Sequence, residues 1–288
     1  MKAAVLHGVE DLRYEDSPTP EAGEGEVVIR VKATGICGSD VPRVNGTAAH
    51  YYPIILGHEF SGVVAETGAG VTNVKPGDRV TAAPLVPCMK CEDCRKGNYS
   101  LCRHYKFIGS SLFGSFADYV KAPAANVVPF GANVDFIQGA FFEPTTVALH
   151  GIKCAGYHGG EYAAVLGGGT VGMFTMQWAK ALGALRVVVF DISKTRLELA
   201  KRLGADCVDT TEPGFLEKAM ELTGGKGYGF VFETAGQNAT MDIAFDLAAN
   251  KASVCFIGTS SRDLAFPWKQ FEKMNRKEFR LTGSWRYF

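Results

Sequence analysis

Four cysteines at short, regular spacing constrain the fold of this chain more than any other feature. Cys88, Cys91 and Cys94 are three residues apart, and Cys102 follows after a longer gap. Two-residue gaps let a tight loop turn successive sulfurs to one side, and the longer loop brings back the fourth, so four thiolates can surround one tetrahedral ion. The spacing therefore predicts a structural zinc lobe.

Three other interpretations of these cysteines compete with zinc. A disulfide framework fits poorly, because no signal-peptide pattern opens the chain and the other four cysteines are scattered. An iron–sulfur cluster also uses two-residue gaps, but there the fourth cysteine comes sooner and a proline follows it, whereas Arg103 follows Cys102 here. Ordinary surface cysteines are the third interpretation. Zinc agrees best with the spacing.

The composition is that of an ordinary globular protein with room for two domains. The chain has 288 residues, of which 47% are hydrophobic and 21% charged, and 30 basic residues balance 30 acidic ones. No basic run favours nucleic acid or an anionic membrane, and no apolar run reaches membrane-spanning length. We therefore expect small-molecule partners and, from the metal-type cysteine spacing, a location in the reducing cytoplasm.

The first part of the chain is rich in short β-type runs separated by glycine and proline. Residues 27–31, 60–64 and 78–81 are examples. This pattern predicts a small, irregular β-barrel or sandwich. An apolar, alanine-rich segment over 136–158 is expected to form a helical bridge, so we place the first domain at residues 1–145.

The second part, residues 146–288, alternates strands with helices. Six strands joined by crossover helices predict a doubly wound parallel sheet, which makes the fold class α/β. The expected strands are 163–167, 186–190, one near Cys207, 230–233, 254–257 and 279–283, and the expected helices are 171–182, 194–203, 215–222 and 239–248.

A glycine-rich turn at the start of the second domain predicts a dinucleotide site. Its residues are Gly167, Gly168, Gly169, Thr170, Val171 and Gly172. By itself the pattern is weak, because such turns join many strands to helices. Here an apolar strand precedes it, a helix follows, and the next strand ends in Asp191.

The residues of this turn have distinct expected roles. Gly167 makes the tight turn, Gly169 lets the backbone approach the pyrophosphate, and Gly172 packs the helix on the sheet, with the phosphates at the helix N-terminus. Asp191 can accept hydrogen bonds from both ribose hydroxyls and would repel a 2′-phosphate, so NAD is preferred to NADP. Arg196 either covers the adenine face or is solvated. The alternative for the whole set is an ordinary strand–helix turn and a surface aspartate.

A second group of metal-type residues lies in the first domain. Cys37 ends a β-rich run, and His58 and Glu59 open another. Cysteine, histidine and carboxylate together suit a zinc ion that thiolates do not fully enclose. Taken singly, Cys37 reads as a buried apolar thiol and His58 as a core or loop histidine. Beside a zinc lobe and a nucleotide turn, the metal interpretation is favoured.

Together these motifs resemble the zinc-containing medium-chain dehydrogenase/reductase family, also called the alcohol dehydrogenase family. The resemblance rests on the segments 35–40 and 57–62, the four-cysteine lobe and the glycine-rich turn, and it covers the whole chain. Within the family the segments 38–43, 49–53 and 142–144 are most similar to polyol dehydrogenases. The resemblance implies a GroES-like first domain, a Rossmann-type second domain, two zinc ions and NAD.

The resemblance also implies particular roles in catalysis. Cys37 and His58 become ligands of a catalytic zinc, Glu59 and Glu143 become direct or water-mediated carboxylate ligands, and Ser39 passes the alcohol proton towards solvent. The structural alternatives are a helix-start carboxylate for Glu143 and a turn residue for Ser39. The expected reaction is hydride transfer from a secondary alcohol of a sugar alcohol, or of its phosphate, to NAD.

Substrate contacts and assembly are less constrained by the sequence. Arg43, His50 and Tyr51 are candidates to contact a polar or phosphorylated substrate, with surface loops as the alternative. We expect a homodimer or homotetramer through the edge strand 279–283.

By the same resemblance, the chain stops earlier than family members usually do, so the first domain is expected to lack its closing segment. A catalytically impaired protein that binds NAD and zinc is therefore one alternative. The same chemistry on threonine or a simple alcohol is another.

Overall fold

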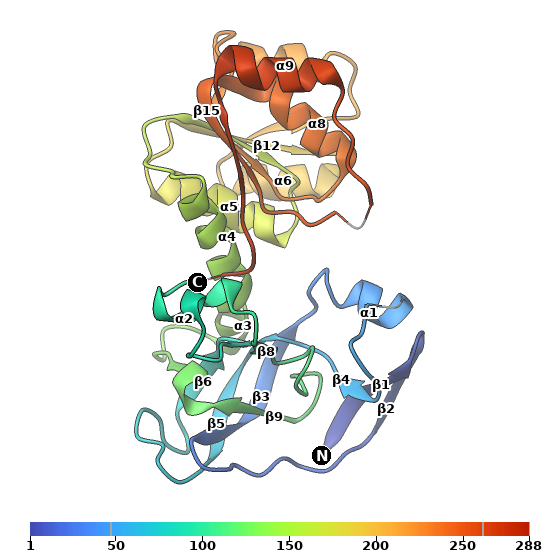
Figure 1. Cartoon of the computed structure of the whole chain (residues 1–288), viewed down its shortest axis with the longest axis vertical. Coiled ribbons are helices and arrows are strands. Elements are labelled where there is room, and N and C mark those ends of the chain that lie inside the picture. The colour runs from blue at the N-terminus through green and yellow to red at the C-terminus, as the bar shows by residue number, and fades with distance from the viewer. Residues whose placement is uncertain (47, 261, 288) are drawn as a thin grey trace. The chain divides into compact units, whose positions relative to one another are not determined.

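The computed structural model describes residues 1–46, 48–260 and 262–287. It divides into two compact units, Met1–Glu143 and Pro144–Phe288, which are described separately. Within the described residues, none of the helices is long and apolar enough to cross a membrane. Figure 1 shows the elements of both units.

Antiparallel strands form most of the first unit. A five-stranded sheet has the order β10-β6-β5-β3-β9, and a three-stranded sheet has the order β2-β1-β4. The strands are β1 (Lys2–Gly8), β2 (Asp11–Asp16), β3 (Glu26–Gly35), β4 (Ile54–Ile55), β5 (Glu59–Thr67), β6 (Arg79–Ala82), β7 (Leu85–Val86), β8 (Lys106–Phe107), β9 (Tyr119–Pro123) and β10 (Val127–Pro129). The expected irregular β-domain is confirmed.

The helices of the first unit are short. They are α1 (Val41–Asn45), α2 (Glu92–Arg95), α3 (Phe136–Ala140) and two 3₁₀ turns, η1 (Tyr99–Leu101) and η2 (Ala124–Asn126). A capping box between Asp135 and Gln138 starts α3, because each side chain accepts a hydrogen bond from the other residue's backbone N–H. The predicted helical bridge is therefore two helices, α3 and α4 (Phe142–Cys154).

The second unit is a six-stranded parallel sheet with the order β13-β12-β11-β14-β15-β16. Its strands are β11 (Tyr162–Leu166), β12 (Arg186–Asp191), β13 (Asp206–Asp209), β14 (Tyr228–Glu233), β15 (Ala248–Phe256) and β16 (Arg280–Gly283). Its helices after α4 are α5 (Thr170–Ala181), α6 (Lys194–Arg202), α7 (Phe215–Glu221), α8 (Asn238–Leu247) and α9 (Trp268–Lys277). The predicted doubly wound sheet is confirmed, with two apolar clusters built around its strands.

Two elements of the second unit differ from the sequence prediction. β15 begins at Ala248 instead of residue 254, and its register against β14 shifts near Tyr228. Helix α9 was not predicted. Its contacts with α8 are polar, with Gln270 buried, and Met274 packs on the apolar core of this unit. Trp268 and Phe271 are 69% and 60% exposed.

The strand order reverses between β11 and β14. In open α/β sheets, ligands bind beyond the carboxyl ends of the strands at such a switch point. The glycine-rich turn follows β11 directly, so the topology places it where a dinucleotide is expected.

Candidate metal and dinucleotide sites

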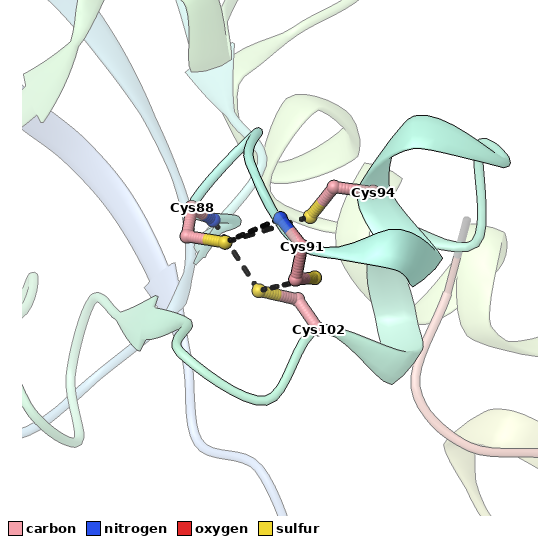
Figure 2. Close-up of side chains that lie close together, drawn as sticks. All are labelled: Cys88, Cys91, Cys94 and Cys102. Atoms are coloured by element: carbon pink, nitrogen blue, oxygen red, sulfur yellow. Dashed lines mark hydrogen bonds between the residues drawn. The ribbon is translucent and has the colours of Figure 1, made fainter.

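The four-cysteine lobe occupies the loop between β7 and β8 (Figure 2). The sulfurs of Cys88 and Cys94 are 4.0 Å apart, and those of Cys91 and Cys102 are 3.9 Å apart. A tetrahedral zinc ion with Zn–S bonds of about 2.3 Å requires sulfur separations of roughly 3.8 Å. All four sulfurs lie within 4.8 Å of one another, so they fit a single tetrahedral ion.

The protonation of these thiols also bears on metal binding. The backbone N–H groups of Lys90 and Cys91 donate to Cys88 Sγ and lower the pKa of Cys88 to about 6. Burial raises the pKa of Cys94 to about 12. The loop thus favours a thiolate at Cys88, whereas Cys94 needs a cation to lose its proton. All eight cysteines of the chain are free thiols, which contradicts the disulfide interpretation.

The mixed site is assembled by the pairing of two strands. Cys37 follows β3, and His58 precedes β5, whose first residue is Glu59. In the antiparallel register Gly35 lies opposite Glu59, so the two segments meet although they are distant in sequence. A Cβ at Gly35 would come within 2.3 Å of Glu59 Oε2, so a larger residue there would displace this carboxylate. Ligand atoms of Cys37, His58 and Glu59 lie within 4.8 Å of one another.

Burial disfavours the deprotonated forms of the acidic groups at this site. It raises the pKa of Cys37 to about 11 and also raises the pKa of Glu59. Burial and the negative charges of Glu59 and Asp40 raise the pKa of Glu143 to about 8. A thiol and several carboxyl groups share a poorly solvated space, and a divalent cation would satisfy them better than protons do. The donor set therefore fits zinc.

Asp40 is a buried residue beside this cluster for which the sequence predicted no role. Its Oδ2 accepts the backbone N–H of Cys37 at 3.0 Å, and its Oδ1 lies 3.6 Å from His58 Nδ1. Burial lowers the pKa of His58 to about 4, so the imidazole is neutral, as a metal ligand must be. His58 Nδ1 has no hydrogen-bond partner among the described residues, so the 3.6 Å approach of Asp40 is not a hydrogen bond. Its position in the same short run as Cys37 and Ser39 was the available indication.

Ser39 and Arg43 lie beside Cys37. The Ser39 hydroxyl donates to Cys37 Sγ at 3.3 Å, and Arg43 Nη1 donates to Ser39 Oγ at 2.9 Å. Arg43 also contacts Asp40 and Ser110, and its side chain is 16% exposed, so its guanidinium lies beside the cluster.

The other two candidate substrate contacts are more exposed. His50 is exposed. Tyr51 is 40% exposed and lines a cavity of about 610 Å³ in the first unit, together with Val86 and Lys106. The cavity lining includes none of the candidate metal ligands.

The glycine-rich turn has the geometry expected of a phosphate-binding turn. Gly167 has a φ of +100°, which favours glycine, and Gly169 is the N-cap of α5, with open space around its Cβ position. A Cβ at Gly172 would lie 1.8 Å from the carbonyl oxygen of Gly167, so this glycine allows the close approach of helix and turn. Thr170 and Val171 form the first turn of α5.

Asp191, the last residue of β12, is hydrogen-bonded to this turn. Its Oδ2 accepts the N–H of Gly168 at 2.6 Å, and its Oδ1 accepts the N–H of Ser193 at 2.8 Å. Arg196 Nη1 lies 3.6 Å from Asp191 Oδ2, and the arginine side chain is 56% exposed. A carboxylate is thus held beside the turn, with a cation on its solvent side.

A β-domain with two cation-type clusters, followed by a sheet with a phosphate-binding turn at its switch point, defines a metal- and dinucleotide-dependent dehydrogenase. The model of the alcohol dehydrogenase GroES-like domain matches residues 23–132, and that of the zinc-binding dehydrogenase domain matches residues 170–288. The chain belongs to the zinc-binding dehydrogenase family. The predicted family, fold class and enzyme class are therefore confirmed.

Several relatives are similar along most of the chain. Galactitol 1-phosphate 5-dehydrogenase of Escherichia coli is 38% identical over 99% of this chain and 83% of its own length. A crystal structure of that Escherichia coli dehydrogenase matches with a TM-score of 0.95, over 100% of this chain and 84% of the other. Sorbitol dehydrogenase of Bacillus subtilis is 34% identical over 91% of this chain and 76% of its own. L-threonine 3-dehydrogenase of Bacillus velezensis is 40% identical over 82% of this chain and 70% of its own.

Proposed function

We propose that this protein oxidises a secondary alcohol of a sugar alcohol or sugar-alcohol phosphate, with zinc and NAD. The observation that carries the proposal is the mixed thiol–imidazole–carboxylate cluster of Cys37, His58 and Glu59 in a chain that also has a dinucleotide turn. Galactitol 1-phosphate 5-dehydrogenase and sorbitol dehydrogenase among its relatives support a polyol-type substrate. The free cysteines support a reducing cytoplasm as its location.

Each metal site has a proposed ligand set. Cys88, Cys91, Cys94 and Cys102 would hold a structural zinc, because four thiolates leave no position for substrate. Cys37 and His58 would hold the catalytic zinc, with Glu59 and Glu143 as direct or water-mediated ligands. When bound, zinc lowers the pKa of the substrate alcohol, and NAD accepts the hydride from the alcohol carbon.

The remaining residues of the mixed site prepare it for this chemistry. Asp40 fixes the backbone of Cys37 through one oxygen, and its other oxygen lies 3.6 Å from Nδ1 of the His58 ring that would bind zinc. Ser39 is within hydrogen-bond distance of Cys37 Sγ, so its hydroxyl would accept the proton of an alcohol bound beside that sulfur and release its own proton towards solvent. Arg43 holds the Ser39 hydroxyl and adds a positive charge that favours the deprotonated alcohol.

Asp191 supports NAD as the preferred cofactor. Its carboxylate is beside the phosphate-binding turn, where it would accept hydrogen bonds from ribose hydroxyls and oppose a 2′-phosphate. Arg196 approaches the same carboxylate from the solvent side and would cover the adenine face.

A homodimer through β16 accompanies this function. β16 ends the six-stranded sheet, so one of its edges has unpaired backbone groups, and Leu281 on it is 42% exposed. The aromatic side chains of Trp268 and Phe271 on α9 are also exposed and would add apolar area to such an interface.

Two other functions remain as outcomes of the test. L-threonine 3-dehydrogenase among the relatives favours the same chemistry on threonine. A protein that binds NAD and zinc without turnover is the second. A spectrophotometric screen of polyols, polyol phosphates, threonine and simple alcohols with NAD separates them. We expect NADH from a polyol or its phosphate, whereas NAD binding without NADH from any substrate would contradict the proposal.

A further inference from the structure

Glu233 is a fully buried carboxylate outside the residues discussed so far. It is the last residue of β14, with 0% exposure, and it lies opposite Leu166 in the pairing of β14 with β11. These two strands flank the switch point of the sheet. A buried carboxylate at this position needs a physical explanation, because burial without partners strongly disfavours its charged form.

The hydrogen bonds of Glu233 are divided very unevenly between its two oxygens. Oε1 accepts the backbone N–H groups of Ala235 and Gly236, at 3.0 and 2.9 Å, and the hydroxyl of Thr240 at 2.6 Å. Oε2 is buried and has no hydrogen-bond partner among the described residues. One oxygen of the carboxylate therefore accepts all of these hydrogen bonds from the turn after β14 and from Thr240, and the other oxygen accepts none from the described residues. The carboxylate thus fixes the conformation of the turn, although one of its own oxygens stays buried without a partner.

The turn that Glu233 holds, residues 234–236, packs directly on the glycine-rich turn. The Thr234 hydroxyl lies 3.0 Å from the carbonyl oxygens of both Leu166 and Gly167. A Cβ at Gly167 would come within 2.9 Å of Ala235 Cβ, so the two turns touch without spare room. A displacement of the 234–236 turn must therefore move Gly167 or open a gap beside it.

The 234–236 turn is also closely packed on its other side, against Gly258. Gly236 has a φ of +65°, and a Cβ at Gly258 would lie 2.3 Å from the Gly236 nitrogen and 2.7 Å from Glu233 Oε2. The unpaired oxygen thus faces a glycine after β15, where a larger residue would not fit.

We propose that Glu233 is a positioning residue for the dinucleotide: it fixes the 234–236 turn, and this turn holds Gly167 in the conformation that receives the pyrophosphate. The inference rests on the proposed NAD site. It assigns Glu233 no contact with the cofactor itself. Loss of the carboxylate should weaken cofactor binding more than the accompanying loss of stability would suggest.

The test measures NADH binding by fluorescence titration, with no turnover, in the full chain. Glu233→Leu removes the acceptor, and we expect NADH affinity to fall roughly tenfold or more. Glu233→Gln keeps an acceptor at Oε1 and should stay within about threefold of wild type. Thr240→Val removes one donor and is the second variant if the leucine protein does not fold, with an expected loss between the other two.

Thr223→Val is the matched control. Thr223 is buried at the turn before β14, where its hydroxyl donates to the carbonyl of Met220 and accepts the N–H of Gly227. This variant should lower the melting temperature and leave NADH affinity unchanged.

Three results would contradict the proposal or its basis. Wild-type NADH affinity in the folded Glu233→Leu protein, or in Thr240→Val if the former does not fold, would make Glu233 a purely structural residue. Equal weakening of NADH binding by Thr223→Val would show that general destabilisation causes the effect. A wild-type chain that does not bind NADH would instead overturn the proposed function on which the inference rests.

Discussion

The guanidinium of Arg43 lies 2.9 Å from the hydroxyl of Ser39, which in turn lies 3.3 Å from the sulfur of Cys37. A permanent positive charge is thus linked, through one hydroxyl, to a proposed zinc ligand. Because arginine does not lose its proton in proteins, Arg43 cannot relay a proton itself. Its contribution is to hold Ser39 and to favour negative charge at the bound alcohol.

Replacing Arg43 by lysine tests this relationship. Lysine keeps the charge but cannot reach Ser39, Asp40 and Ser110 together, so we expect kcat to fall roughly tenfold, as for loss of a hydrogen bond to a charged group. Steady-state kinetics with a polyol and its phosphate give the measurement. An equal fall for both substrates is expected. A rise in KM for the phosphate alone would show that Arg43 binds the phosphate directly. Arg13→Lys, at an exposed ion pair of the same unit, is the control and should change neither constant.

The two sites should differ in how readily they lose their zinc ion to a chelator. The untreated protein is expected to contain two zinc ions per chain, and mild chelation should remove the one at Cys37 and His58 while the fold is retained. Cys94→Ser should remove the other and lower the melting temperature, whereas Cys207→Ser in the second unit should keep both ions. Metal analysis and circular dichroism decide this. Iron in the four-cysteine site, or no metal in untreated protein, is incompatible with the assignment.

The pH dependence of the stability of the metal-free protein should reflect the ionisation of Glu143. Its pKa is raised from an ordinary value of 4.5 to about 8, so the folded state holds this proton more tightly than the unfolded chain does. The stabilisation is fully present below pH 4.5 and is lost as the pH rises towards 8. Glu143→Gln cannot ionise and avoids this loss.

Thermal unfolding after zinc removal therefore compares the two proteins. We expect the melting temperature of Glu143→Gln to rise steadily relative to that of wild type as the pH rises from about 5 to 8. Below pH 5 the difference between the two melting temperatures should change little. A constant difference at every pH would mean that Glu143 titrates normally. Addition of zinc should reverse the order, because the wild-type carboxylate then has a cation to pair with.

Cofactor choice should depend on Asp191. Asp191→Ala removes two hydrogen-bond acceptors and a negative charge, so NAD affinity should fall roughly tenfold while NADP affinity holds or rises. Titration of both cofactors into wild type and variant is the measurement, and Asp206→Ala, an exposed carboxylate on β13, is the control. Equal wild-type affinities for NAD and NADP would show that Asp191 does not choose between them.

Association through β16 should be visible by light scattering at micromolar concentration. We expect a dimer, and Leu281→Lys should shift it towards the monomer because the charge would be buried at the interface. Leu12→Lys, a similarly exposed leucine in the first unit, should have no effect. A monodisperse particle of 31.0 kDa in the wild type would show that the edge strand is blocked.

Local patterns predicted those parts of the molecule that depend on neighbouring residues in the sequence. The cysteine spacing sufficed to predict that four sulfurs meet around one point, because all four come from one loop, and the glycine-rich pattern sufficed to predict the tight turn between β11 and α5. The alternation of strands and helices gave the sheet of the second unit, but not the early start of β15, where Lys251 adopts a left-handed conformation with a φ of 60° inside the strand.

Residues whose roles depend on distant partners were missed. Asp40 Oδ1 lies 3.6 Å from His58 Nδ1, eighteen positions away, and Glu233 holds a turn that packs on Gly167, far away in the sequence. Helix α9 was missed for a related reason: Gln270 and Lys273 contact Asp242 and Asp246 of α8, so its contacts with that helix are polar. The aromatic side chains of Trp268 and Phe271 are exposed instead of buried in the core.

Gly35 pairs with Glu59 across β3 and β5, so the mixed site needs the pairing of two strands that are distant in sequence. The two metal sites should therefore form at different stages of folding. All four cysteines of the lobe lie within one loop, so that loop can gather an ion while the rest of the chain is still unfolded. The residues of the mixed site come together only when β3 and β5 have paired in register. Glu143 is the last residue of the first unit, so it reaches Glu59 and Asp40 only when the C-terminal end of that unit has folded. Zinc uptake would then occur in two stages, the first nucleating a loop and the second marking completion of the unit.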